Sequence, residues 1–360
     1  MSKNKYEIDM CNGTIMDKLI SFSVPLMLSG ILQLMFNAVD IIVVGRFAGS
    51  QSLAAVGSTT ALINMFVNLF IGVSLGANVL AARFYASGKH KEMSETVHTA
   101  ITFAAISGVV MALIGVLMAK PALELMGTPD DVINLSTLYM RIYFLGMPFF
   151  MLYNYGAAIL RAVGDTKRPL MYLIIAGSTN AVLDLVLVII FKMGVAGVAI
   201  GTVTSQLISC ILVIRCLMTT ESDYKLRIRD LRIRKYYLLQ ILSVGLPAGI
   251  QSTVINFSNV LLQSSVNSFG EIAMAGYTAA NNILGFLYVS VNSITQACMS
   301  FTSQNYGVRK FKRMDKVLID CMILSVIVSV VIGGGSYILG RQILGIYTNQ
   351  SEVIECGMEI

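Results

Sequence analysis

One stretch of the chain, residues 161–204, contains polar side chains whose types and spacing suit the binding of a cation. Asp184 lies within an apolar run of helical length, and Asn180 precedes it by four residues. Residues four apart share one face of an α-helix, so the amide and the carboxylate face the same way. A carboxylate at the centre of a membrane helix costs about 2.5 to 3.5 kcal/mol, and such residues are usually functional. Asp184 is therefore the first candidate for a functional residue.

A second carboxylate and a hydroxyl are expected at a similar depth. Because a helix rises about 1.5 Å per residue, Asp184 lies about 24 Å and Asp40 about 27 Å along their helices from the inner side. Thr202, on the following helix, lies about 12 Å from the outer side. In a hydrocarbon core about 30 Å thick, these three residues and Asn180 can meet in the outer half.

These four side chains suit a coupling ion, which is either Na+ or H+. Na+ would bind about five or six oxygens, which two carboxylates, an amide carbonyl, a hydroxyl and water can supply. A proton would need only a carboxylate. The residues alone do not distinguish these ions, and the alternative role of the aspartates is hydrogen bonding between neighbouring helices.

Three further polar residues are candidates for lining an adjacent substrate cavity. They are Gln33, Asn37 and Tyr139. Asn37 and Gln33 lie about one and two helical turns before Asp40, so they can face the same space. Hydrogen bonding from helix to helix explains these two residues equally well.

The elements that position these residues are predicted to be membrane helices. Hydrophobic residues make up 56% of the 360-residue chain and charged residues only 13%, whereas about a quarter of the residues of an average soluble protein are charged. Uncharged runs longer than the roughly 18 residues of a spanning helix recur along the chain. We therefore expect an all-α, polytopic membrane bundle. The predicted helices cover residues 16–44, 51–81, 96–118, 131–160, 168–191, 194–217, 236–265, 272–304 and 316–340. Pro25 is expected to kink the first helix and to act as a hinge.

The basic residues predict the orientation in the membrane. With the N-terminus inside, twenty-one Lys and Arg residues lie on the inner side and only four on outer loops. This asymmetry predicts a cytoplasmic N-terminus in a plasma-membrane protein. The net charge of +6 then reflects loops that face an anionic leaflet, so the lipid bilayer and not a nucleic acid is the expected partner.

The six cysteines and two histidines do not form a recognisable framework. None of the cysteines forms a Cys-x-x-Cys pair, and we interpret them as small packing residues. His90 and His98 are too few for a transition-metal site. The chain also lacks paired histidines and a nucleophile motif, so we expect no enzyme activity and no cofactor besides the coupling ion.

An internal repeat organises the predicted helices. A shift of about 222 residues places Val24-Pro25 on Leu246-Pro247, and Tyr85-Ala-Ser-Gly-Lys resembles Asn305-Tyr-Gly-Val-Arg-Lys. Six helices separate the copies, so both have the same orientation, as in some secondary transporters. We expect an N-terminal lobe at 1–218, a basic cytoplasmic linker at 219–235 and a C-terminal lobe at 236–360. By this repeat, the second of the two pseudo-symmetric six-helix lobes would be incomplete. The chain would have nine helices and the start of a tenth in all. It would then bind a cation without sustaining export by itself.

Several spaced motifs resemble the multidrug and toxic compound extrusion family. They are VPLMLSGILQLMFNAVDIIVVGRFAGSQSLAAVG, YMRIYFLGMPFF followed by RAVGDTKRPL, and NAVLD before GVAGVAIGT. The resemblance covers nearly the whole chain and implies a twelve-helix antiporter with a central cavity. Such a protein would export organic, often cationic compounds in exchange for Na+ or H+.

The resemblance and the residues together favour a cation-coupled exporter of drug-like organic cations that acts as a monomer. The alternative within the same superfamily is a lipid-linked oligosaccharide flippase, which would need a larger and cationic cavity. Asp40 and Asp184 make the expected cavity acidic and so favour cationic cargo.

Overall fold

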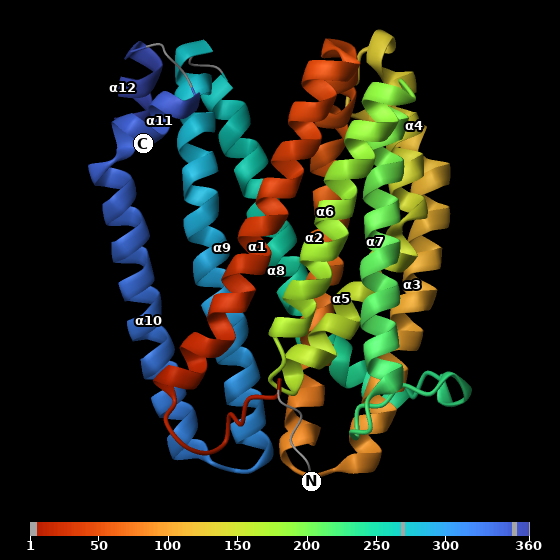
Figure 1. The fold of residues 1–360 in the computed structure, drawn as a ribbon, viewed down its shortest axis with the longest axis vertical. Coiled ribbons are helices and arrows are strands. Elements are labelled where there is room, and N and C mark those ends of the chain that lie inside the picture. The colour runs from red at the N-terminus through yellow and green to blue at the C-terminus, as the bar shows by residue number, and fades with distance from the viewer. Residues whose placement is uncertain (1–5, 268–270, 348–350, 360) are drawn as a thin grey trace.

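The computed structural model describes residues 6–267, 271–347 and 351–359, and within these ranges the chain forms helices and no strand. Eight helices are long and apolar enough to cross a membrane, and a ninth span is obtained when one bent pair of helices counts as one. The prediction of an all-α, multi-pass membrane protein is confirmed. Figure 1 shows the helices running roughly side by side along the long axis of the molecule.

Twelve α-helices and three shorter turns of helix follow one another along the described chain. The α-helices are α1 (Met16–Val43), α2 (Ser50–Ala86), α3 (His90–Leu125), α4 (Asp130–Leu145), α5 (Met147–Ala162), α6 (Lys167–Leu185), α7 (Gly194–Thr219), α8 (Lys235–Asn267), α9 (Glu271–Gly307), α10 (Phe311–Ile338), α11 (Gly340–Tyr347) and α12 (Ser351–Glu359). The shorter elements are two π-helical turns, η1 (Val44–Ala48) and η2 (Val186–Ile190), and a 3₁₀ turn, η3 (Ile228–Asp230).

The single helix expected over 131–160 is wrong, because the chain bends by 45° between α4 and α5. The break falls at Gly146, two residues before Pro148. Proline has no N–H to donate to the preceding turn, and its ring collides with that turn, which favours a bend in the helix. The bend is fixed by packing, since a Cβ on Gly108 of α3 would collide with the backbone of Pro148. Pro25, by contrast, lies inside α1 without interrupting it, and its role as a hinge stays a prediction.

The N-terminal segment and four of the connections lie at one end of the bundle, which we call the basic end (Figure 1). The connections are residues 87–89, 163–166, 220–234 and 308–310. Helices α1–α7 and helices α8–α10 approach each other at the basic end and diverge toward the opposite end in this view. We call α1–α7 the first set of helices and α8–α12 the second set.

Glycines bring the two sets together where α2 packs against α8. Gly72 and Gly76 of α2 face Gly245 and Gly249 of α8, and a Cβ on any of them would collide with backbone of the other helix. Both pairs have the four-residue spacing that lets helix backbones approach closely in membranes. We call these four glycines the glycine seam. They lie in α2 and α8, the pair of helices that packs most extensively between the two sets.

Residues 6–15 cross the basic end and touch both sets of helices. Glu7 accepts hydrogen bonds from the phenols of Tyr85 (2.8 Å) and Tyr224 (2.9 Å). The carbonyl of Met10 accepts a hydrogen bond from the Asn305 amide of α9 at 3.1 Å. The side chain of Met10 is fully buried. The N-terminal segment is therefore packed structure that connects α2 and the 220–234 connection with α9.

Candidate functional site

A cavity within the first set of helices contains nearly all of the candidate residues. It has a volume of about 250 Å³ and is lined from α1, α2, α4, α5, α6 and α7. Among its lining residues are Gln33, Asn37, Asp40, Tyr139, Asn180 and Thr202. We call this space the acidic cavity. Asp184 is not part of its surface, because the side chain is fully buried directly behind the wall.

The two candidate carboxyl groups lie next to each other. Asp40 of α1 lies close enough to Asp184 of α6 and to the Thr202 hydroxyl of α7 to interact with both. The amide of Asn180 donates a hydrogen bond of 3.3 Å to Oδ1 of Asp184. The four residues predicted from helix depth are thus brought together, and their role in coupling stays a prediction.

The pair of carboxyl groups has unused capacity to bind a cation. Oδ1 of Asp40 and Oδ2 of Asp184 are both buried and have no hydrogen-bond partner among the described residues. A buried acceptor without a partner costs about 1 to 3 kcal/mol, and more when it is charged. Buried charges are normally paired or coordinate a metal. These oxygens, with the Asn180 carbonyl and the Thr202 hydroxyl, therefore fit either a shared proton or Na+.

The local backbone supports the position of both carboxylates. Each aspartate is followed within a few residues by a π-helical turn, η1 after Asp40 and η2 after Asp184. Such turns are rare and occur frequently at functional sites. Gly201 of α7 lies against Asp184, and a Cβ at that position would collide with Oδ1. The glycine therefore lets α7 come close enough to place Thr202 beside the acidic pair.

Sequence reasoning missed several neutral polar residues of the acidic cavity. They include Asn64, Tyr143, Tyr153, Asn154, Ser205 and Gln206. Tyr143 stacks on Tyr139 with 6.3 Å between ring centroids, and the buried Oε1 of Gln206 has no hydrogen-bond partner within the described part of the chain. Each follows a predicted residue by four positions, Tyr143 after Tyr139 and Gln206 after Thr202, so helical spacing alone could have identified these two.

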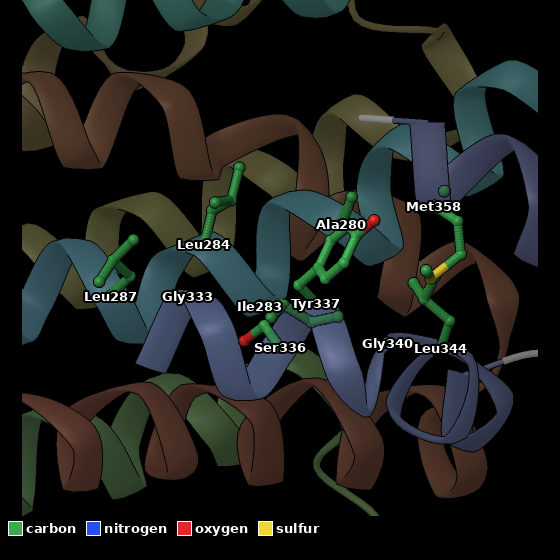
Figure 2. A pocket seen from close by; sticks show the side chains of 11 residues that line it. Ala280, Ile283, Leu284, Leu287, Gly333, Ser336, Tyr337, Gly340, Leu344 and Met358 are labelled. Carbon is green, nitrogen blue, oxygen red and sulfur yellow. The ribbon is translucent and has the colours of Figure 1, made fainter. Parts of the chain in front are cut away.

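Two further cavities involve the second set of helices, and neither has a charged residue in its described lining. One has a volume of about 520 Å³ and is lined by asparagines of α2, α8 and α9. The other, of about 200 Å³, lies between α9 and α10–α12 (Figure 2) and is mostly apolar, with leucines 284, 287 and 344 in its wall. Neither of these two cavities has a carboxylate in its described lining, so the acidic cavity is the candidate for cation binding.

Comparison with known proteins assigns the chain to a family. The MatE family model matches residues 25–186 and 247–360. The chain is 32% identical over 341 residues to "Probable multidrug resistance protein YoeA" of Bacillus subtilis (strain 168), across 92% of this chain and 73% of that protein. The chain belongs to the MATE family. The two matched segments begin at Pro25 and Pro247, 222 residues apart, which agrees with the internal repeat.

Other MATE relatives agree with this assignment. "Multidrug export protein MepA" of Staphylococcus aureus (strain NCTC 8325 / PS 47) is 22% identical over 347 residues, across 94% of this chain and 74% of that protein. A solved structure described as the outward-facing conformation of a multidrug resistance MATE family transporter superposes with a TM-score of 0.92. That match has 21% sequence identity and covers 99% of this chain and 80% of the other. It therefore shows the fold.

Membership of the MATE family makes this chain a multi-pass membrane transporter for multidrug efflux. The family is a family of transporters, and the relatives are named for multidrug resistance and multidrug export. The predicted resemblance to this family is confirmed. The flippase alternative is not favoured, because the relatives are multidrug proteins and the cavity is acidic.

Proposed function

We propose that this MATE protein exports organic cations in exchange for Na+ or H+, with Asp40 and Asp184 as the coupling pair. The observation that carries the proposal is the contact between these two carboxyl groups at the wall of the acidic cavity. Each has one buried oxygen that finds no hydrogen-bond partner among the residues that the structure describes. Two adjacent carboxylates repel each other unless a cation or a proton lies between them. Ion release and binding at this pair would therefore change the charge of the cavity.

The chemistry of the cavity supports a cationic, partly aromatic cargo. The wall combines the acidic pair with tyrosine rings at positions 139, 143 and 153. Carboxylates attract a cation by charge, and aromatic faces attract it through their quadrupole. Bound Na+ would be held by Asp40, Asp184, Asn180 and Thr202 and would neutralise the pair. A cargo cation and the coupling ion would then compete for the same negative charge, which is the basis of exchange.

The orientation and setting are part of the same proposal. The basic end carries most of the Lys and Arg residues of the loops, and such residues favour the cytoplasmic side. The N-terminus would then be cytoplasmic and the protein a monomer in the plasma membrane. In this orientation the two sets of helices are in contact on the cytoplasmic side, and transport would require the glycine seam to separate.

The test is the movement of a fluorescent organic cation such as ethidium in proteoliposomes that contain the purified protein. A Na+ gradient and a pH gradient are imposed separately, each with and without an ionophore that collapses it. We expect one of the two gradients to drive uphill movement of ethidium and its ionophore to abolish that movement. Uphill movement in the absence of both gradients, or none with either, would falsify cation exchange.

A further inference from the structure

A small basic pocket lies at the junction of the two sets of helices, at the basic end. It has a volume of about 230 Å³. The first set contributes Arg83, Phe84, Ser87 and Lys89, and the second set contributes Tyr306, Gly307, Arg309 and Phe311. We call this the junction pocket. Three of its residues are cationic and none is acidic, so an anion is the ligand that its charge favours.

The three cations of the junction pocket have no carboxylate partner in the part of the chain that the structure describes. Arg83 stacks over the ring of Tyr306, with 4.9 Å from its guanidinium carbon to the ring centroid. Stacking on an aromatic ring orients a guanidinium and leaves its N–H groups free to donate. Some other basic groups at this end are paired with a carboxylate, for example Arg232 with Glu95. The junction pocket therefore holds unused positive charge.

The backbone at the junction pocket is the same in both halves of the repeat, with one informative difference. After α2 the left-handed position that closes the helix end is Gly88 (φ 66°), and after α9 it is Arg309 (φ 59°). Glycine adopts this conformation without strain, whereas other residues do so at a cost of about 1 to 2 kcal/mol. Arginine occupies the strained position, and its side chain lines the pocket.

The hydrogen bonds of the two loops confirm that the positions are equivalent. In each loop one backbone N–H donates to the carbonyl five residues earlier in the chain. The N–H of the preceding residue donates to the carbonyl three residues earlier than itself. They run from Lys89 to Phe84 (3.1 Å), Gly88 to Tyr85 (3.2 Å), Lys310 to Asn305 (2.9 Å) and Arg309 to Tyr306 (3.0 Å). The arginine therefore stands where the fold prefers a glycine, and strain of this kind is a reason to look for function.

Two helices begin at the junction pocket. Lys89 precedes the first residue of α3, Phe311 is the first residue of α10, and neither helix has a side chain that caps its N-terminus. Free N–H groups and the positive end of the helix dipole both favour an anion at such a place. They add to the charge of the three cationic side chains.

We propose that the junction pocket binds a phosphate group. Guanidinium groups match the oxygens of phosphate through paired N–H donors, and the volume suits a group of that size. Arg83 approaches from the first set and Arg309 from the second. The backbones of the two sets also touch here, since a Cβ on Gly307 would collide with Arg83. The phosphate therefore bridges the two sets and stabilises their contact at the basic end. Its source is either the headgroup of an anionic phospholipid or a free phosphate in solution.

The experiment uses a fluorescent reporter that the sequence makes simple. The chain has no tryptophan, and Phe311 is 55% exposed at the pocket, so the Phe311→Trp variant has a single tryptophan beside the site, excited at a wavelength that the tyrosines do not absorb. Its emission is titrated with inorganic phosphate and, separately, with dihexanoylphosphatidylglycerol, in a neutral detergent and a buffer without phosphate. We then add Arg83→Gln or Arg309→Gln. The matched control is Arg229→Gln, an exposed arginine of η3 at the same end of the bundle.

We expect saturable binding of at least one probe, weakened about tenfold or more by either pocket variant and unchanged by the control. Binding of inorganic phosphate assigns the source to solution, and binding of the lipid alone assigns it to the headgroup. Melting temperatures show whether each variant is folded. The proposal is overturned if folded variants bind as the control does, or if neither probe binds.

Discussion

Gly72 of α2 and Gly249 of α8 bring the backbones of the two sets of helices into direct contact. A Cβ on Gly72 would collide with the Cα and the N of Gly249. Gly72 is in the half of α2 nearer to the basic end, because α2 ends there at Ala86. A side chain at either position therefore acts as a wedge between the sets.

We expect Gly72→Ala to lower the stability of the protein and to slow transport. Alanine in place of glycine gains up to about 1 kcal/mol in helix propensity, but overpacking costs about 1 to 3 kcal/mol. The matched control is Gly57→Ala in the same helix, because a Cβ there meets nothing within 4 Å. Melting temperature in detergent and initial rate of ethidium movement are compared. A Gly72→Ala variant as stable and active as Gly57→Ala would show that the seam is not a close contact.

The acidic pair provides the second prediction. Asp40→Asn and Asp184→Asn each remove the charge that would bind and release the coupling ion, while amides preserve size and polarity. We expect both variants to insert and fold but to lose gradient-driven uphill movement of ethidium. Asp131→Asn is the matched control, since Asp131 is exposed in the first turn of α4. Normal uphill movement by either variant of the pair would remove it from the coupling site.

Hydropathy located the helices but not all of their ends. The helix expected to begin at residue 96 begins at His90, because its first turns are polar and lie at the basic end, where a helix no longer needs apolar side chains. The break at Gly146 was predictable from Pro148, whose missing N–H ends a helix locally. The apolar run on both sides of this proline is long, so hydropathy alone predicted one continuous helix and not a break.

The acidic pair could be predicted because depth in a membrane follows directly from the rise of a helix. Asp40 and Asp184 are on different helices, yet their distances from the inner side agreed. The depth of a residue in the membrane does not indicate which helices are neighbours, so the contact of α2 with α8 was not predicted. Its pattern was present as glycines four apart, Gly72 with Gly76 and Gly245 with Gly249. The N-terminal segment was also missed, since the burial of Met10 depends on packing against distant helices.

The orientation provides the third prediction. The connection between α7 and α8 contains six of the chain's Lys and Arg residues when Lys235 is included, so we expect it on the cytoplasmic side. Ser222→Cys should be labelled by an impermeant maleimide in inverted vesicles and not in intact cells. Asp131→Cys, at the opposite end of the bundle, should show the reverse. The unsubstituted protein, whose six cysteines are free, provides the background. Labelling of Ser222→Cys from outside intact cells would reverse the orientation.

The last prediction concerns the anchoring of the N-terminal segment through Glu7 and Tyr224. The Tyr224 phenol donates a hydrogen bond of 2.9 Å to Oε1 of Glu7, and Tyr85 donates one of 2.8 Å to Oε2. Hydrogen bonds to a charged group contribute about 1.5 to 3 kcal/mol. We expect Glu7→Gln and Tyr224→Phe each to lower the melting temperature, with the double variant little worse than Glu7→Gln alone, because the loss of the Glu7 charge already weakens the bond from Tyr224.

Alkaline pH should affect the same contact. Burial, with the nearby charge of Glu7 in addition, raises the pKa of Tyr224. The folded protein then keeps the phenol protonated at a pH where the unfolded chain, with a pKa of about 10, has lost that proton. The stabilisation is fully present below about pH 10 and is lost as the pH rises toward the folded pKa. The melting temperature of Tyr224→Phe should therefore fall less between pH 9 and 11 than that of the unsubstituted protein. The difference between the two falls should be on the order of the linkage of one proton. Parallel falls in the two proteins would show that Tyr224 titrates alike in the folded and unfolded states.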